Sequence, residues 1–137
     1  MHGVFILPPE LRARIEEEVQ AALPRECCGL IEGIRSGNEW RAMQVHATRN
    51  LAKDEDRFEI DPAEQFALMR ALRETPRDII GCYHSHPNGR AEPSSSDGDG
   101  EDGFVWLIAA LDGADGVTLS AHLRDRGGWQ ELAIKSG

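Results

Sequence analysis

The segment of residues 81–97, GCYHSHPNGRAEPSSSD, constrains the fold most, because it gathers several metal-binding side chains around the end of one predicted strand. Side chains two positions apart in a strand point to the same face, so His84 and His86 can aim at one ion. The turn-forming residues PNGRAEP can then bring Asp97 back as a third ligand. Two histidines and a carboxylate leave one zinc position open for water, which is typical of a hydrolytic site.

The spacing within this segment resembles the signature of a known enzyme family. His84, Ser85 and His86 are followed after seven residues by Ser94, and after two more by Asp97, which gives the order HSHx7SxxD. This order is the signature of the JAMM (MPN+) zinc metallopeptidases. The chain is similar to their prokaryotic single-domain members of the Mec+ type, which process sulfur carriers.

Two further stretches carry the resemblance. Residues 24–31, PRECCGLI, are similar to the family's upstream PxExCGLL segment, and residues 57–62, RFEIDP, are similar to its middle RFxIDP stretch. The resemblance therefore covers most of the chain. It implies an α/β fold of the JAMM/MPN (cytidine-deaminase-like) type, in which two principal helices flank a mixed β-sheet.

The resemblance also implies roles for particular residues. It assigns zinc to His84, His86 and Asp97, and it makes Glu26 the base that takes a proton from the attacking water and passes it to the leaving amine. It makes Ser94 the donor that stabilises the oxyanion. From the residues alone, a glutamate such as Glu26 is most often a solvated charge at a helix end, and Ser94 has the alternative role of a turn or helix cap.

Length and charge restrict the class of protein. The 137 residues predict one domain, residues 1–137, and no apolar run approaches the roughly 18 residues that a membrane span needs. The net charge of −9 opposes a general nucleic-acid binder. The start of the chain lacks the pattern of a signal peptide, and three cysteines fit a reducing compartment. We therefore expect a cytoplasmic protein with no membrane or nucleic-acid partner.

Hydrophobic periodicity predicts two helices. Pro8 and Pro9 introduce the first, whose apolar stripe runs through Leu11, Ile15, Val19, Ala22 and Leu23. The second begins with the cap Asp61, Pro62 and a capping-box Glu64, and it carries an apolar face of Phe66, Met69 and Leu72. Patterns typical of strands occupy residues 4–7, 28–34, 40–48, 79–83, 104–111, 117–123 and 129–134. We expect residues 104–111 to form a buried central strand.

Other residues offer alternatives. Cys82 lies on the same strand face as His84 and has three alternatives: a ligand in a Cys/His/His metal site, a thiol nucleophile or a buried core residue. For Cys28 the choice is between a nucleophile and a core residue. We expect both to be core residues, and we expect His2, His46 and His122 to lie outside the site. Glycines follow Asp97 where the family usually begins a helix, so Asp99 is a conceivable substitute ligand.

Together these features predict a zinc metallopeptidase that hydrolyses a peptide or isopeptide bond after the C-terminal Gly-Gly of a ubiquitin-like or sulfur-carrier protein. A short chain without long insertions suits such a simple extended tail, bound by strand addition beside the metal. We also expect the charged loop of residues 50–57 to order against this tail. The alternatives are a non-catalytic scaffold of the same fold and a cysteine-dependent hydrolase.

Overall fold

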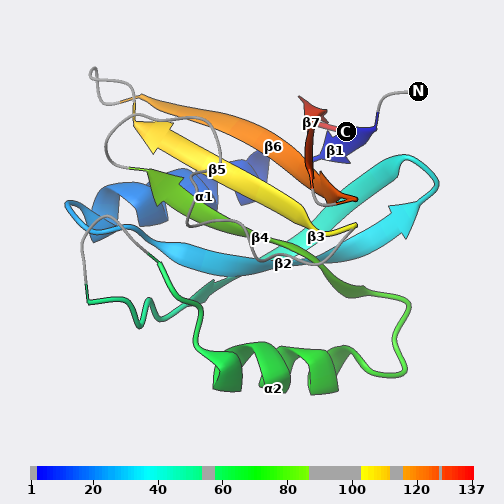
Figure 1. The fold of residues 1–137 in the computed structure, drawn as a ribbon, viewed down its shortest axis with the longest axis horizontal. Coiled ribbons are helices and arrows are strands. Elements are labelled where there is room, and N and C mark those ends of the chain that lie inside the picture. The colour runs from blue at the N-terminus through cyan, green and yellow to red at the C-terminus, as the bar shows by residue number, and fades with distance from the viewer. Residues whose placement is uncertain (1–2, 54–57, 87–102, 112–115, 127) are drawn as a thin grey trace.

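The computed structural model describes residues 3–53, 58–86, 103–111, 116–126 and 128–137. Within these residues the mixed α/β architecture is the predicted one, with helices on a mixed sheet (Figure 1). The elements in chain order are β1 (Val4–Ile6), α1 (Pro9–Ala22), β2 (Cys28–Ser36), β3 (Glu39–Thr48), α2 (Pro62–Leu72), β4 (Asp78–His86), β5 (Val105–Leu111), β6 (Val117–Asp125) and β7 (Gly128–Lys135).

The strands close into a barrel in the order β1-β3-β2-β4-β5-β6-β7. The short strand β1 completes it, because it pairs in parallel with β3 on one side and with β7 on the other. Strand β2 is antiparallel to β3 and β4, whereas β4 and β5 are parallel. This closure was not predicted. Strand β4 lies between β2 and β5 and so has a partner strand on each side.

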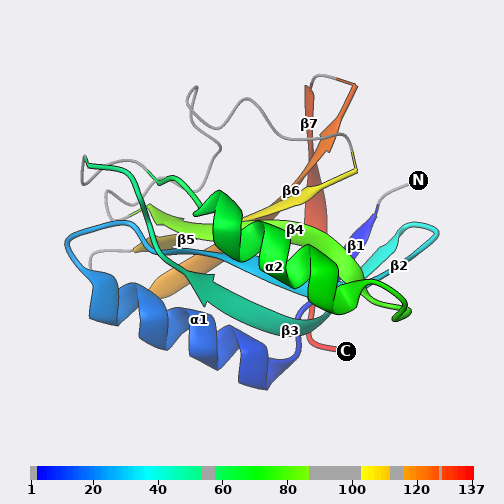
Figure 2. The same cartoon turned by 90° about the horizontal axis from the view of Figure 1, so that it is seen from below.

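Helix α1 covers one side of the sheet (Figure 2). The predicted stripe residues Leu11, Ile15 and Val19 are buried in the larger hydrophobic core, with Ala22 packed against it. Leu23 is 41% exposed, so its place in the stripe was wrong. The helix ends at Ala22, one residue earlier, and Leu23 therefore leaves the helical surface that faces the core.

Helix α2 lies on another side of the sheet and begins as predicted, because the Asp61 carboxylate accepts a hydrogen bond from the Ala63 N–H at 2.9 Å. The capping box was wrong. Glu64 Oε2 instead accepts from the Arg49 backbone N–H at 2.8 Å. The end of β3 lies beside the start of α2. The Glu64 carboxylate, which the local pattern assigned to the helix cap, therefore accepts its hydrogen bond from Arg49, a residue distant in the chain.

The prediction of which face of α2 meets the sheet was also wrong. Phe66 and Met69 are 57% and 52% exposed, and of the three predicted residues only Leu72 is partly buried. Leu68 makes the contact, packing against a smaller apolar cluster centred on Leu30, Cys82 and Trp106. Leu68 and Leu72 are four residues apart and share one face of the helix, which differs from the face that carries Phe66 and Met69.

Strand β5 is the buried central strand that the apolar run predicted, paired with β4 and β6 along its length. The last two strands, predicted at residues 117–123 and 129–134, are β6 and β7, which form an antiparallel pair. The stretch of residues 112–116, whose aspartates and glycines are typical of a turn, lies mostly outside the described residues. No described helix combines the length and the apolar character that crossing a bilayer requires.

Candidate metal centre

The site forms where β2 begins and β4 ends. These strands are antiparallel with Cys28 opposite His84, so continuing the register by two residues places Glu26 opposite His86. Side chains at alternate positions share a face, and Glu26, His84 and His86 therefore meet on one side of the sheet. All three side chains are buried, with Glu26 only 6% exposed.

The donor atoms of these three residues lie close enough to bind one ion. The Nε2 atoms of His84 and His86 are 3.0 Å apart, and the Glu26 carboxylate lies within 4.8 Å of both rings. Tetrahedral zinc with bonds of about 2.0–2.1 Å would hold two imidazole nitrogens about 3.3 Å apart. Imidazole nitrogens are ligands that zinc prefers, and a carboxylate beside them can serve as a further ligand or as a base, so the residues present fit this metal.

Aromatic rings fix the orientation of His84. The Phe58 ring stacks on its imidazole at 4.1 Å between centroids, with an interplanar angle of 16°. The Trp106 ring meets the same imidazole edge-on at 5.8 Å. Residue-by-residue reasoning missed Phe58 as part of the site. The signal was its place in the RFEIDP stretch that resembles the family's middle motif.

Ser85, between the two histidines, points to the opposite face, as the alternation of side chains along a strand requires, and has a structural role. Its hydroxyl accepts a hydrogen bond from the Cys27 N–H at 2.8 Å, and its own N–H donates to the Cys27 carbonyl at 3.1 Å. These two bonds hold the chain next to Glu26 against the histidine strand. Ser85, which lies between the two histidines, thus also anchors Cys27, the residue next to Glu26.

Two predicted site residues cannot be placed. Ser94 and Asp97, together with the substitute ligand Asp99, lie in residues 87–102, outside the described residues. The third zinc ligand and the oxyanion donor therefore stay predictions.

The cysteines are core residues, as expected. Cys27, Cys28 and Cys82 are all buried, and Cys82 belongs to the smaller apolar cluster. Burial raises the pKa of the Cys28 thiol to about 11 and that of the Cys27 thiol to about 12. A thiol with such a pKa stays protonated near neutrality, which disfavours Cys28 as a nucleophile.

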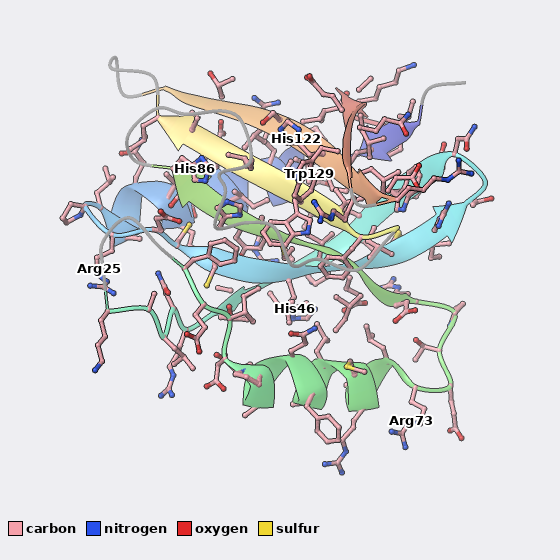
Figure 3. The ribbon with its side chains drawn as sticks, in the orientation of Figure 1. Arg25, His46, Arg73, His86, His122 and Trp129 are labelled. Carbon is pink, nitrogen blue, oxygen red and sulfur yellow. The ribbon has the colours of Figure 1, made fainter. Side chains whose placement is uncertain are left out.

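The remaining described histidines lie outside the metal-binding group. His46 Nε2 is 2.8 Å from Glu32 Oε1, and His122 Nε2 is 3.0 Å from Ser120 Oγ. Figure 3 shows His86 near the end of β4, apart from both. Of the clusters that described residues form, the group of Glu26, His84 and His86 is the one with metal-binding geometry.

Comparisons with known proteins agree with this geometry. A family model for prokaryotic homologs of the JAB domain matches residues 8–122. A desampylase of Haloferax volcanii is 30% identical over 114 residues, which cover 81% of this chain and 78% of that protein. A desampylase of Pyrococcus furiosus is 27% identical over 105 residues, covering 75% of this chain and 72% of that protein.

Solved structures show the same fold. A solution structure of a protein from Desulfitobacterium hafniense has a TM-score of 0.83 at 26% identity, covering 96% of this chain and 90% of that one. A JAB1/MPN domain protein from Archaeoglobus fulgidus has a TM-score of 0.58 at 16% identity, covering 97% of this chain and 98% of that one. With the family model spanning most of its length, the chain belongs to the prokaryotic JAB domain family.

Proposed function

We propose that this protein is a zinc-dependent JAMM-type metallopeptidase that hydrolyses a peptide or isopeptide bond after the C-terminal Gly-Gly of a ubiquitin-like or sulfur-carrier protein. The buried group of Glu26, His84 and His86 carries the proposal, because its donor atoms fit a catalytic zinc. The name desampylase, which both curated relatives bear, supports the same class of activity.

In this proposal His84 and His86 hold the metal, with Asp97 as the third ligand. Bound zinc would supply Lewis-acid activation of a water molecule and of the scissile carbonyl. Glu26 takes the proton of the attacking water at its carboxylate and delivers it to the leaving amine, so that one group serves as base and then as acid. The Ser94 hydroxyl donates a hydrogen bond to the developing oxyanion.

The surroundings of the described residues suit this chemistry. His84 is fully buried beneath the Phe58 ring, and Glu26 is almost fully buried. Apolar walls exclude bulk water, and fixed groups then act on developing charge more strongly than they would in water. The intact group also opposes a non-catalytic scaffold, which would have no use for a buried carboxylate beside two imidazoles.

The closed barrel changes how a substrate tail can bind. Beside the histidines β4 is paired on one side with β5, and on the other side the Ser85 N–H is bonded to the Cys27 carbonyl. Beside the histidines β4 therefore has no open edge, and a tail that binds by strand addition, as the sequence predicts, must add to another segment. We propose instead that it lies along residues 50–53 and 58–60, next to the Phe58 ring.

A cleavage assay tests the function. Zinc-loaded protein is incubated with carrier fusions ending in Gly-Gly-Xaa and in Ala-Arg-Xaa, and with a carrier joined through its Gly-Gly end to a lysine side chain, and mass loss is followed. We expect cleavage after Gly-Gly and none after Ala-Arg, with activity lost on chelation and restored by zinc. Equal cleavage of both tails, or binding of the carrier without any cleavage, would contradict the proposal.

A further inference from the structure

We propose that Asn50 is a positioning residue, whose single side chain couples Glu26 to the rim segment, defined as residues 50–53 and 58–60. The inference rests on the proposed function, because it concerns how the proposed base is held. Asn50 is half-buried at the end of β3 and belongs to none of the three stretches that resemble the family motifs.

The donor end of the Asn50 amide holds the backbone of Glu26. Its Nδ2 donates a hydrogen bond to the Glu26 carbonyl oxygen at 2.9 Å. Glu26 precedes the first residue of β2, so its carbonyl lies outside the regular ladder of that strand. Ser85 secures Cys27 from one side, and Asn50 secures Glu26 from the other. The peptide group between Glu26 and Cys27 is thus held by two polar side chains, one at its carbonyl and one at its N–H.

The acceptor end of the same amide closes the rim segment. Asn50 Oδ1 accepts from the Ala52 N–H and from the Glu59 N–H, each at 2.9 Å. The Leu51 N–H donates to the Glu59 carbonyl at 2.9 Å, and Asn50 and Ile60 form an isolated bridge. Both tasks together need a donor and an acceptor at this reach, and the amide of Asn50 supplies them on two separate atoms.

The rim segment also reaches the metal centre directly. Phe58 precedes Glu59, and its ring stacks on the His84 imidazole at 4.1 Å. A second tether runs from the other neighbour of Glu26, because Arg25 Nη2 donates to the Ala52 carbonyl at 2.5 Å; Figure 3 labels this arginine beside the segment. A substrate that presses on the rim segment therefore acts on the backbone of Glu26 and on the ring over His84 together.

Two substitutions separate the two ends of the amide. Asn50→Asp keeps the acceptor for Ala52 and Glu59 but places an oxygen against the Glu26 carbonyl, whereas Asn50→Ala removes both ends. Asn38→Ala is the control, because Asn38 is an exposed asparagine in the turn between β2 and β3. All variants are measured as zinc-loaded full chains on the Gly-Gly fusion, and as metal-free chains by amide hydrogen exchange and NMR.

We expect Asn50→Asp to lower kcat by about 10–100-fold with a smaller change in KM, as loss of an orienting partner typically does. Its Glu59 amide should stay protected from exchange, its His84 ring protons should keep the shift imposed by the Phe58 stack, and zinc affinity by chelator competition should be unchanged. In Asn50→Ala the Ala52 and Glu59 amides should also lose their protection from hydrogen exchange. KM should rise, because the rim segment is no longer held in a single conformation.

Three results would overturn the role of Asn50 in an active protein. These are a wild-type kcat in Asn50→Asp, protection of the Glu59 amide that survives Asn50→Ala, and an equal loss of kcat in Asn38→Ala. A wild-type protein that is inactive on every Gly-Gly substrate would instead overturn the proposed function, and with it this role. If Asn50→Ala does not fold, the Asn50→Asp comparison still decides.

Discussion

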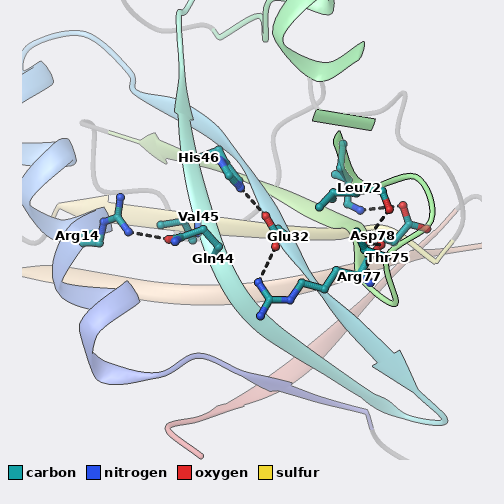
Figure 4. A network of polar contacts seen from close by, with 10 residues as sticks. Arg14, Glu32, Gln44, Val45, His46, Leu72, Thr75, Arg77 and Asp78 are labelled. Carbon is teal, nitrogen blue, oxygen red and sulfur yellow. Dashed lines mark hydrogen bonds and ion pairs between the residues drawn. The ribbon is translucent and has the colours of Figure 1, made fainter. Parts of the chain in front are cut away.

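Two buried glutamates, Glu26 just before β2 and Glu32 in the middle of that strand, show how differently one residue type can be used. Glu26 is 6% exposed and Glu32 is 7% exposed. Glu32 binds two side chains at once, with Arg77 Nη1 at 2.7 Å and His46 Nε2 at 2.8 Å (Figure 4). Glu26 instead lies beside the ring nitrogens of His84 and His86.

The difference lies in the cation that each carboxylate faces. A buried carboxylate loses its hydration, and a nearby cation or hydrogen-bond donors must offset that cost in free energy. Burial alone would raise the pKa of Glu32, but the hydrogen bonds from Arg77 and then His46 outweigh it and hold that pKa below its ordinary value. At Glu26 the neighbouring imidazoles can hold a metal ion, and the proposed function uses the carboxylate for proton transfer. Both glutamates are buried, but they differ in the cation beside them. Arg77 and His46 give Glu32 a structural role, whereas in the proposed function a metal ion lies beside Glu26 and this residue takes part in the chemistry.

The largest expected effect is on the metal. His84→Ala and His86→Ala should each abolish stoichiometric zinc and with it all turnover, because each removes one of the few protein ligands. His46→Ala, on the Glu32 side, should keep a full equivalent. Metal analysis of the purified variants measures this. A full equivalent of zinc in His84→Ala would show that the ligands are assigned wrongly.

Next in size is the contrast between the two glutamates themselves. Glu26→Gln should keep zinc but lower kcat by about 10²–10⁴-fold, because an amide preserves shape and cannot carry the proton. Glu32→Gln should turn over like the wild type but lose about 1–3 kcal/mol of unfolding free energy, because Arg77 and His46 lose a charged partner. Steady-state kinetics and urea unfolding measure the two effects. Near-normal turnover in Glu26→Gln would sink its role as the base.

A smaller effect on kcat is expected at Ser94, the proposed oxyanion donor. Ser94→Ala should lower kcat by about 10²–10³-fold with zinc retained, as loss of one oxyanion donor does. Ser96→Ala is the matched control and should leave kcat unchanged. Equal effects from both serines would indicate a turn or cap instead of an oxyanion donor.

The pH dependence of stability should separate Glu32 from Glu18, whose carboxylate accepts a hydrogen bond from the Tyr83 hydroxyl at 2.7 Å. The folded pKa of Glu32 is lowered, so its contribution is present above the ordinary value of 4.5 and is lost as pH falls through the folded value. Burial raises the pKa of Glu18, so stability is lost as pH rises from 4.5 through its folded value.

Glu32→Gln should therefore remove part of the acid destabilisation of the wild type. Glu18→Gln should remove part of the decline that follows as pH rises above 4.5. Urea unfolding at a series of pH values measures both slopes. Slopes that change in the same direction in the two variants would contradict the assigned signs.

The smallest expected effect is that of thiol reagents. Burial holds the pKa of Cys28 at about 11, so the folded protein should keep its activity after iodoacetamide treatment near neutral pH. Urea-unfolded protein should react fully and serves as the control. Rapid inactivation of the folded enzyme, with zinc still bound, would revive the cysteine-dependent alternative.

Local patterns predicted those parts of the fold and site that depend on near neighbours in the chain. The pairing of His84 with His86 follows from strand alternation, and the buried stripe of α1 follows from helical periodicity. The cap of α2 at Asp61 follows from its own first turn.

Features set by distant segments could not be read in the same way. Only the antiparallel register of β2 against β4 brings Glu26 to His86, and a motif resemblance had to stand in for that register. Glu64 satisfied the pattern of a capping box, but the end of β3 supplied a better donor from Arg49. The choice of Leu68 over Phe66 depends on a rotation of α2 that local periodicity does not determine.

Closure of the barrel by β1 bears on how the chain is made. Val4 pairs with Glu39 soon after both are synthesised, but its other partner is Ala133 in the last strand. Until β7 has been synthesised, β1 therefore lacks its second partner strand. The strands that carry the metal-binding group, β2 and β4, are synthesised before β7. Contacts that join the two ends of a chain form late and slow its folding. A nascent chain stalled before residue 133 should thus be able to bind zinc while it is still open to proteases at its first strand.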